Sequence, residues 1–169
     1  FNDNFDNAVN AEWTSSDSGT WAISSTYMNQ SNEINTNTNI YTSVNQTSAY
    51  TYLYHCQMKV GGTGTNRRAG FHFFSDNSTL PNRGNGYFVY FRVDNQKAQI
   101  YKVVSDAFTL ESDVVYAFAA NTFYDFKATY NPSSGEIKVF VNDVFVSSWT
   151  DTSPITSGNS ISLRTGNCT

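Results

Sequence analysis

The sequence has 169 residues and a formal net charge of −4, with 14% charged and 16% aromatic residues. This length suits one domain with a sizeable core, and the aromatic content excludes a disordered chain. The acidic balance, with no run of basic residues beyond Arg67-Arg68, argues against nucleic acid as a partner, and no apolar run approaches membrane-spanning length. Abundant Asn, Ser and Thr are typical of extracellular β-proteins, so we expect an extracellular or cell-surface location.

The N-terminal part shows short alternating stretches and almost no helical periodicity. The opening FNDNFD is predicted to be a short strand or an extended segment, and residues 20–24 and 27–31 a hairpin. A short strand is expected at 40–42. The longest strand candidate is 49–60, whose inward face would carry Tyr50, Tyr52, Tyr54, Cys56, Met58 and Val60.

The central block, residues 66–103, reads as three strands. Side chains in a strand point to opposite faces in turn, so one face of each strand can line a core. The turn between the second and third strands is expected at residues 94–96. The predicted core set is Ala69, Phe71, Phe73, Tyr87, Val89, Phe91, Val93, Ala98 and Ile100.

Further strands follow the central block. Asn131-Pro132-Ser133-Ser134-Gly135 has the chemistry of a turn, because Pro fixes φ and Gly allows a positive φ. Asn142-Asp143 is a second turn. The remaining strands are predicted at 114–118, 122–130, 136–141, 144–149 and 160–165. About a dozen short strands without helices predict an all-β fold with two antiparallel sheets in a sandwich, occupying residues 1–169 as one domain.

The two cysteines, Cys56 and Cys168, allow one disulfide in an oxidising compartment. Cys56 falls on the inward face of its strand, whereas Cys168 is out of phase with Ile161 and Leu163. A bulge at Gly166 would restore the phase. The disulfide and the pair of free thiols both remain open at this point.

The face of the central block opposite the core is a candidate sugar-binding surface. Aromatic rings can stack on a sugar, while amide, imidazole and guanidinium groups hold its hydroxyls. Arginine can donate two parallel hydrogen bonds to a carboxylate or sulfate. An anionic polysaccharide would therefore explain the arginines better than a neutral one. The alternative is that a second layer or a neighbouring domain covers this face. The candidate ligand-binding residues are Arg68, His72, Asn82, Arg83, Tyr90, Arg92, Gln99 and Tyr101.

Several motifs resemble the concanavalin A-like, laminin G-like jelly-roll modules. They are the opening F-x-D-N-F-D, the Trp13 and Trp21 pair in W-x(7)-W spacing, and the segment TFYDFKATYNPSSGEIKVFVNDVFVSSW. The block NRRAGFHFF…NRGNGYFVYFRVD…QIYKV is similar to modules of large secreted or cell-surface bacterial proteins. The resemblance covers nearly the whole chain and implies a jelly-roll β-sandwich, a fold that hosts lectins, glycanases, adhesins and spacers alike.

The resemblance also implies a structural Ca²⁺ held by the N-terminal carboxylates Asp3 and Asp6, because hard oxygen ligands suit this hard cation. The alternative for these residues is turn capping. Family members usually close with a further strand, and the sequence stops at Thr169 without one. We therefore expect either a truncated C-terminal edge or an edge that another protein or domain completes.

Catalysis is not expected. Retaining glucanases of this fold carry Glu-x-Asp-x-x-Glu on a concave strand, because hydrolysis needs two nearby carboxylates. The four glutamates, Glu12, Glu33, Glu111 and Glu136, do not have that spacing. The sequence thus predicts a non-catalytic, lectin-like carbohydrate-binding module of a secreted or surface-attached multidomain protein. The alternatives are an adhesion or structural module that contacts other domains and, more weakly, a degenerate glycoside hydrolase relative.

Overall fold

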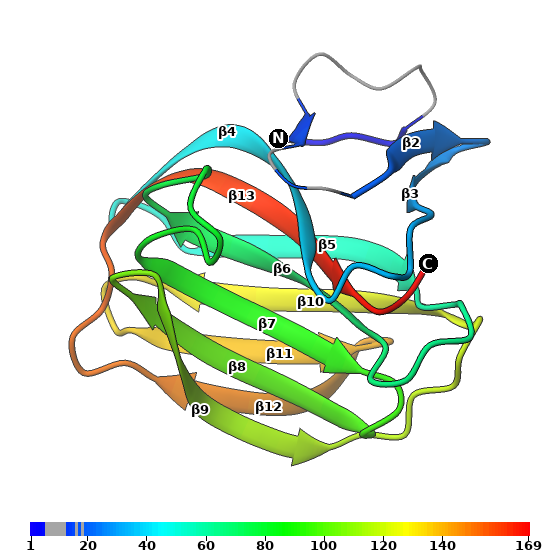
Figure 1. The fold of residues 1–169 in the computed structure, drawn as a ribbon. Coiled ribbons are helices and arrows are strands. Elements are labelled where there is room, and N and C mark those ends of the chain that lie inside the picture. The colour runs from blue at the N-terminus through cyan, green and yellow to red at the C-terminus, as the bar shows by residue number, and fades with distance from the viewer. Residues whose placement is uncertain (6–12, 16, 18) are drawn as a thin grey trace.

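The computed structural model describes residues 1–5, 13–15, 17 and 19–169 (Figure 1), and the predicted antiparallel β-sandwich is confirmed. The larger sheet runs in the order β1 (Thr14–Ser15), β4 (Thr38–Thr47), β13 (Ser157–Gly166), β6 (Arg68–Ser75), β7 (Gly86–Arg92), β8 (Lys97–Val104) and β9 (Ala107–Val115). The smaller sheet runs β12 (Val144–Thr150), β11 (Glu136–Val141), β10 (Phe123–Asn131) and β5 (Tyr52–Lys59). β2 (Trp21–Ser24) and β3 (Tyr27–Gln30) form a separate hairpin, as predicted.

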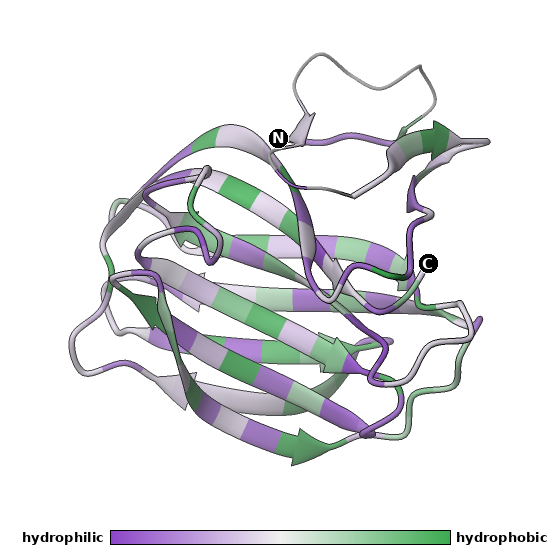
Figure 2. Cartoon of the chain, in the orientation of Figure 1, coloured by the Kyte–Doolittle hydropathy of each residue, from purple (hydrophilic) through white to green (hydrophobic). Residues whose placement is uncertain are grey.

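The core lies between the two sheets and is built from the alternate residues of each strand. Figure 2 shows this alternation as hydrophobic and hydrophilic bands along β8. The predicted inward residues of β6 and β7 are buried in this core. Phe91 of β7 stacks on Phe126 of β10, with ring centroids 3.7 Å apart. Such aromatic pairs contribute about 0.5–1.5 kcal/mol beyond burial, so this contact ties the sheets together.

The last strand of the sequence lies in the middle of the larger sheet. β13 pairs with β4 on one side and with β6 on the other, and the backbone of Gly61 donates to that of Thr169 at 2.6 Å. The last described strand is therefore paired on both sides, and the absence of a further closing strand stays a prediction. The edges of the two described larger sheets are β1, β9, β12 and β5.

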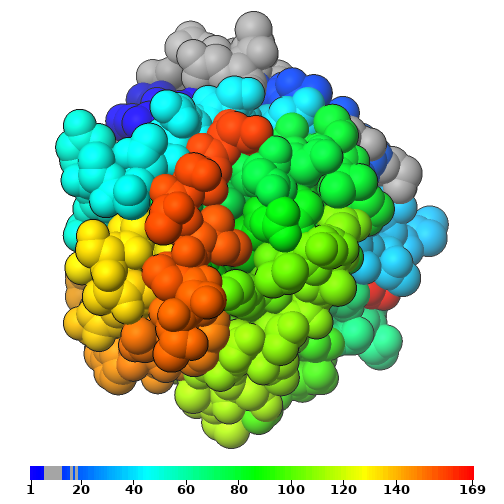
Figure 3. Space-filling view, turned by 90° about the vertical axis from the view of Figure 1, so that its left-hand side faces the viewer, coloured from blue at the N-terminus to red at the C-terminus, as the bar shows by residue number. Residues whose placement is uncertain are grey.

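One end of the sandwich is closed by the connection from β12 to β13. Figure 3 shows this connection, in orange, crossing the end of the molecule between yellow and green segments of the two sheets. It carries Asp151, which is 4% exposed. The Asp151 carboxylate accepts a hydrogen bond from Tyr87 Oη at 2.7 Å and forms an ion pair with Lys102 at 2.6 Å. Tyr130 Oη of β10 donates to Tyr87 Oη at 3.1 Å. This buried polar network satisfies its own members and joins strands of both sheets.

The turns follow the predicted chemistry where the sequence is distinctive. Gly135 closes the Asn131–Gly135 turn with φ 72°, and Asn142 and Asp143 both have positive φ, as a tight hairpin turn requires. Several strand boundaries differ from expectation. β4 is longer than the predicted 40–42, β9 begins earlier than the predicted 114–118, and the described opening residues 1–5 form no strand. The described residues contain no helix long and apolar enough to cross a membrane.

Candidate functional site

A hollow of about 220 Å³ lies on the outer face of the larger sheet, the face turned away from the smaller sheet. We call it the arginine pocket, because Arg68 of β6, Arg92 of β7 and Arg164 of β13 line it. Its other lining residues are the aromatics Phe88, Tyr90, Tyr101 and Phe108 and the exposed asparagines Asn37 and Asn66 at the rim. The predicted sugar-binding face thus contains a real depression.

The aromatic floor of the pocket is a second, smaller core. Phe88 and Tyr90 occupy the positions of β7 that alternate with the main-core residues, so they point to the outer face. Phe88 is 1% exposed, and its ring centroid lies 4.4 Å from that of Tyr90 and 5.4 Å from that of Phe108. Tyr101 packs against the same cluster and remains half-buried.

Arg68 is held rigidly at one side of the pocket. Its Nη1 donates to the Asn66 carbonyl and its Nη2 to the Thr36 carbonyl, each at 2.7 Å. Its guanidinium lies 5.8 Å from the ring centroid of Tyr90, a cation–π distance. These contacts use uncharged acceptors, so they orient the guanidinium and leave its charge uncompensated.

Arg164 enters the pocket from β13. Its Nη1 donates to the Pro81 carbonyl at 2.9 Å and to Asn82 Oδ1 at 3.3 Å. The guanidinium lies over the rings of Phe88 and Phe108, at 5.7 and 5.3 Å from their centroids. Burial lowers the pKa of Arg164, although arginine is so basic that the group stays charged.

Sequence reasoning missed Arg164 as a site residue. The available signal was its parity, because Arg164 alternates with the inward-facing pair of Ile161 and Leu163. That parity places Arg164 on the outer face of whichever sheet contains the strand. The pairing of β13 with β6, which sets Arg164 opposite Gly70, spans about a hundred residues of sequence and carries no local signal.

Tyr90 presents a buried hydroxyl to the pocket. Tyr90 is 5% exposed, and its Oη has no hydrogen-bond partner among the described residues. Burial raises the pKa of Tyr90 to about 12, although the Arg68 and Arg164 guanidiniums act in the opposite direction. The hydroxyl is therefore protonated at neutral pH and can both donate and accept a hydrogen bond.

The remaining predicted residues on this face divide into two groups. Arg92 and Tyr101 line the pocket, and Arg92 Nη2 donates to Asn66 Oδ1. Gln99 is 7% exposed and accepts from Tyr101 Oη at 2.8 Å while donating to Asp113 at 3.0 Å. Gln99 therefore orients Tyr101. The ligand-binding roles of Arg68, Tyr90, Arg92 and Tyr101 stay predictions.

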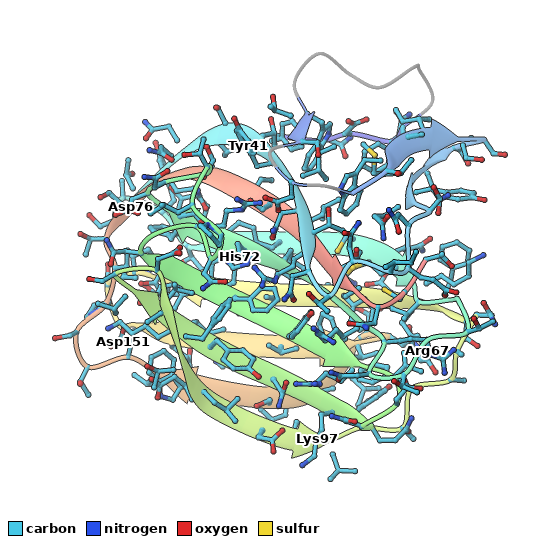
Figure 4. All side chains as sticks on the ribbon, viewed as in Figure 1. Tyr41, Arg67, His72, Asp76, Lys97 and Asp151 are labelled. Carbon is cyan, nitrogen blue, oxygen red and sulfur yellow. The ribbon has the colours of Figure 1, made fainter. Side chains whose placement is uncertain are left out.

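His72 is not available to a ligand, which corrects the sequence-based expectation. Figure 4 labels it near the middle of the larger sheet, and its side chain is fully buried. Its ring stacks on Phe88 at a centroid distance of 4.2 Å, and neither ring nitrogen has a partner among the described residues. Burial, together with the nearby Arg164 and Arg83, holds the pKa of His72 well below its usual value. It is a neutral ring beneath the pocket floor.

Asn82 and Arg83 also have structural rather than exposed positions. Arg83 is fully buried and donates to the carbonyls of Ser78 and Leu80, each at 2.7 Å, and it pairs with Asp17 at 3.2 Å. Asn82 donates to the Asp106 carbonyl at 2.7 Å, in addition to its contact with Arg164. Both therefore brace the loop between β6 and β7, and Asn82 positions Arg164.

Asp3, one of the two carboxylates expected to hold a calcium ion, already has hydrogen-bond partners within the described residues, and the calcium site itself stays a prediction. Asp3 caps its own turn, since Oδ1 accepts from the Phe5 amide at 2.9 Å and Oδ2 accepts from Trp13 Nε1 at 2.8 Å. Asp6 lies outside the described residues. In the part of the chain that the structure describes, no group of three or more His, Cys, Asp or Glu side chains converges as metal ligands would. The geometry therefore favours turn capping for Asp3.

Of the two alternatives that the sequence left open, the disulfide between Cys56 and Cys168 is not formed. Both thiols are free. Cys56 lies on the inward face of β5, and burial raises its pKa to about 12. Cys168 follows β13 in the larger sheet, where its Sγ donates to the Arg68 carbonyl at 3.1 Å. The two cysteines belong to segments of opposite sheets: Cys168 is buried in the main core, and Cys56 is half-buried against the same core.

The comparisons with known proteins identify the fold. No protein-family model matches the sequence, and no curated protein matches it either. Among solved structures, carbohydrate-binding module CBM66 from Bacillus subtilis superposes with a TM-score of 0.77 at 16% identity, covering 93% of this chain and 89% of that one. The β-glucanase of Bacillus licheniformis gives 0.67 at 17% identity over 100% and 85%. Sheep galectin-11 gives 0.57 at 12% identity over 74% and 88%.

These likenesses confirm the predicted concanavalin A-like jelly-roll fold. At such low identity they establish the fold alone, because one fold carries many functions.

Proposed function

We propose that this chain is a non-catalytic carbohydrate-binding module that binds a polysaccharide in the arginine pocket. The observation that carries the proposal is the combination of an open hollow of about 220 Å³, half-buried aromatic walls and guanidinium donors at its sides. Aromatic faces and a few fixed polar groups are the usual components of a small-molecule site. Two solved structures of the same fold, CBM66 and galectin-11, bear names of a carbohydrate-binding module and a lectin.

A hydrolytic role is disfavoured by the chemistry of the pocket. Glycosidases use two carboxylates that flank the scissile bond. None of the residues lining the arginine pocket carries a carboxyl group. Asp113, an acid of the neighbouring strand β9, is already engaged by Lys97 at 3.0 Å and by Gln99 at 3.0 Å. The pocket can therefore hold a sugar and has no group that would cleave it.

One observation favours a second candidate, an adhesion or structural module that contacts other protein domains. Val144 and Phe145 at the start of edge strand β12 are 61% and 54% exposed. Exposed apolar groups on a strand edge are a common place for protein contacts. This candidate would use the smaller sheet and leave the arginine pocket without a role. In either case we place the chain in a secreted or surface-attached multidomain protein.

A glycan array on the purified chain tests the proposal, run with calcium and again with EDTA. We expect binding to one class of polysaccharide. Retention of glycan binding in EDTA would exclude calcium from the site, whereas loss of glycan binding would support the calcium site predicted near the N-terminus. A blank array on protein that melts cooperatively would contradict the sugar-binding function and favour the adhesion role.

Calorimetry with the best glycan then locates the site. Tyr101→Ala should weaken binding roughly tenfold or more, because it removes a half-buried wall of the pocket. The matched control is Tyr50→Ala, which removes a tyrosine that is 69% exposed and lies outside the pocket. Equal affinity for the Tyr101 variant and the native protein would place the glycan elsewhere.

A further inference from the structure

The cationic side chains of this acidic protein are distributed unevenly. Among the described residues, six of the ten Lys and Arg side chains form ion pairs with Asp or Glu. Of the other four, Lys59 lies over the rings of Tyr27 and Phe123, at 5.9 and 5.1 Å. The other three are Arg68, Arg92 and Arg164. The arginine pocket thus collects the positive charge that the described carboxylates do not pair with.

We propose that the arginine pocket binds the anionic group of an acidic sugar, a carboxylate- or sulfate-bearing unit of a polysaccharide. The inference rests on the proposed function and names its class of ligand. Guanidinium groups match such oxyanions with paired, charge-assisted hydrogen bonds. The pocket provides three of them on one face, from three neighbouring strands, β13, β6 and β7.

Buried polar atoms around the pocket lack partners. Arg164 and Tyr90 are each 5% exposed, yet Arg164 Nε and Tyr90 Oη have no hydrogen-bond partner in the described part of the chain. Arg92, two residues after Tyr90 and on the same face of β7, also has an Nε without a hydrogen-bond partner among those residues. Burial of unpaired donors and charges is unfavourable, so natural proteins seldom leave several of them together. An oxyanion in the hollow would provide the missing acceptors.

The guanidiniums are held in place before any ligand arrives. The guanidinium of Arg68 donates hydrogen bonds to the backbone carbonyls of Asn66 and Thr36. That of Arg164 donates to the Pro81 carbonyl. Carbonyl acceptors orient these groups without neutralising them. Preorganised charges lose little conformational entropy on binding, which favours affinity for a complementary anion.

The size and lining of the hollow suit a sugar rather than a bare inorganic ion. Its volume of about 220 Å³ far exceeds the roughly 10–15 Å³ of such space that one water molecule needs. Tyr101 and Phe108 provide ring surfaces beside the arginines, and the exposed asparagines at the rim leave the hollow open. One charged ring of a longer chain can enter while the neighbouring sugars extend outward.

Matched ligands that differ only in charge test the inference on the intact chain. Calorimetry would compare an oligogalacturonide with its methyl ester, and a sulfated galactan oligosaccharide with its desulfated form. We expect one of the charged forms to bind at least roughly tenfold tighter than its neutral counterpart. Higher ionic strength should narrow that difference, because salt screens the arginines. The pair that shows the preference identifies the carboxylate or the sulfate as the ligand group.

Variants assign the preference to the pocket. Arg92→Gln should abolish most of the preference for the charged form, and it is the safer variant because Arg92 is only half-buried. Arg164→Gln should act in the same direction if it folds. The matched control Arg67→Gln removes an arginine that pairs with Asp94 at 2.7 Å and does not line the pocket. It should keep the preference.

The outcomes separate this inference from the proposed function. Equal binding of charged and neutral forms would overturn the acidic-sugar inference and leave carbohydrate binding intact. Absence of binding by folded protein to every one of these forms and to every glycan of the array would overturn both. A preference that survives Arg92→Gln and Arg164→Gln would show that the anion is recognised outside the arginine pocket.

Discussion

The outer faces of the two sheets have similar sequence patterns, but their polar side chains differ in burial and in pairing. Both carry polar or charged residues among the outward-facing positions of their strands. On the smaller sheet the polar groups are solvated and paired, as in the contact of His55 with Asp125 at 3.0 Å and the ion pair of Lys138 with Glu136 at 2.8 Å. On the larger sheet, Arg68 and Arg164 are buried over aromatic rings without a described acidic partner. Alternation therefore defines a face, and its surroundings decide whether that face is a solvated surface or a site.

The largest difference between the faces should appear in stability. Phe88→Ala removes a ring that is 1% exposed and forms the floor of the arginine pocket, so it should lower the free energy of unfolding by about 3–5 kcal/mol. Leu53→Ala, on the smaller sheet, removes a side chain that is 60% exposed and should change stability by about 0.5 kcal/mol or less. Urea denaturation measures both. Similar losses for the two variants would contradict a second core on the outer face.

The buried His72 of the larger sheet should make the stability of the protein depend on pH. His72 is neutral when folded because burial lowers its pKa, whereas in the unfolded chain its pKa is near 6.5. The unfolded state therefore takes up a proton below that value and the folded state does not. Stability should fall with pH from about 6.5 downward, by up to about 1.4 kcal/mol per pH unit. Carboxylates with lowered pKa values, such as Asp94 and Asp113, act at lower pH, around and below about 4.

A leucine variant isolates this effect. His72→Leu should flatten the stability profile between about pH 7 and 5, because it removes the proton-binding group of the unfolded state. The measurement is chemical denaturation at a series of pH values. A native protein with a flat profile in this range would show that His72 is protonated when folded.

The smallest effect should come from the Tyr90 hydroxyl. Tyr90→Phe keeps the ring under Arg68 and removes an unpartnered buried Oη, so stability should stay the same or rise by up to about 1 kcal/mol. Glycan affinity should fall several-fold. The control, Tyr124→Phe, removes a hydroxyl that accepts from the Ala119 amide at 2.8 Å, so it should lower stability by about 1 kcal/mol. A loss of stability in the Tyr90 variant would mean that its hydroxyl already has an internal role.

Local alternation and turn chemistry were enough to predict most of the fold. The inward residues of β6 and β7 and the Asn131–Gly135 turn follow from adjacent residues, so single-sequence reasoning finds them. The turn between β8 and β9 could not be predicted in this way, because Ser105 and Asp106 adopt positive φ and no glycine marks the turn. As a result, the start of β9 was misplaced.

The candidate site was only partly predictable, for a related reason. Arg68, Tyr90 and Arg92 lie on neighbouring strands whose order could be read from short connections. Arg164 joins them only through the pairing of β13 with β6. The burial of His72 and Arg83 depends on how the loop between β6 and β7 folds over the sheet, and residue type alone does not report this. Long-range pairing and loop packing are the steps at which sequence patterns stop being informative.

The central position of β13 has a consequence for how the protein folds. Strands β4 and β6 do not pair with each other directly; each pairs with β13, a partner roughly a hundred residues away in sequence. During synthesis on a ribosome the earlier strands emerge first. The backbone groups of β4 and β6 that pair with β13 then stay exposed until residues 157–166 emerge. Such non-local closure slows folding to the millisecond-to-second range typical of β-sandwiches. Arg164 arrives with the same strand, so the arginine pocket is completed only when the larger sheet closes.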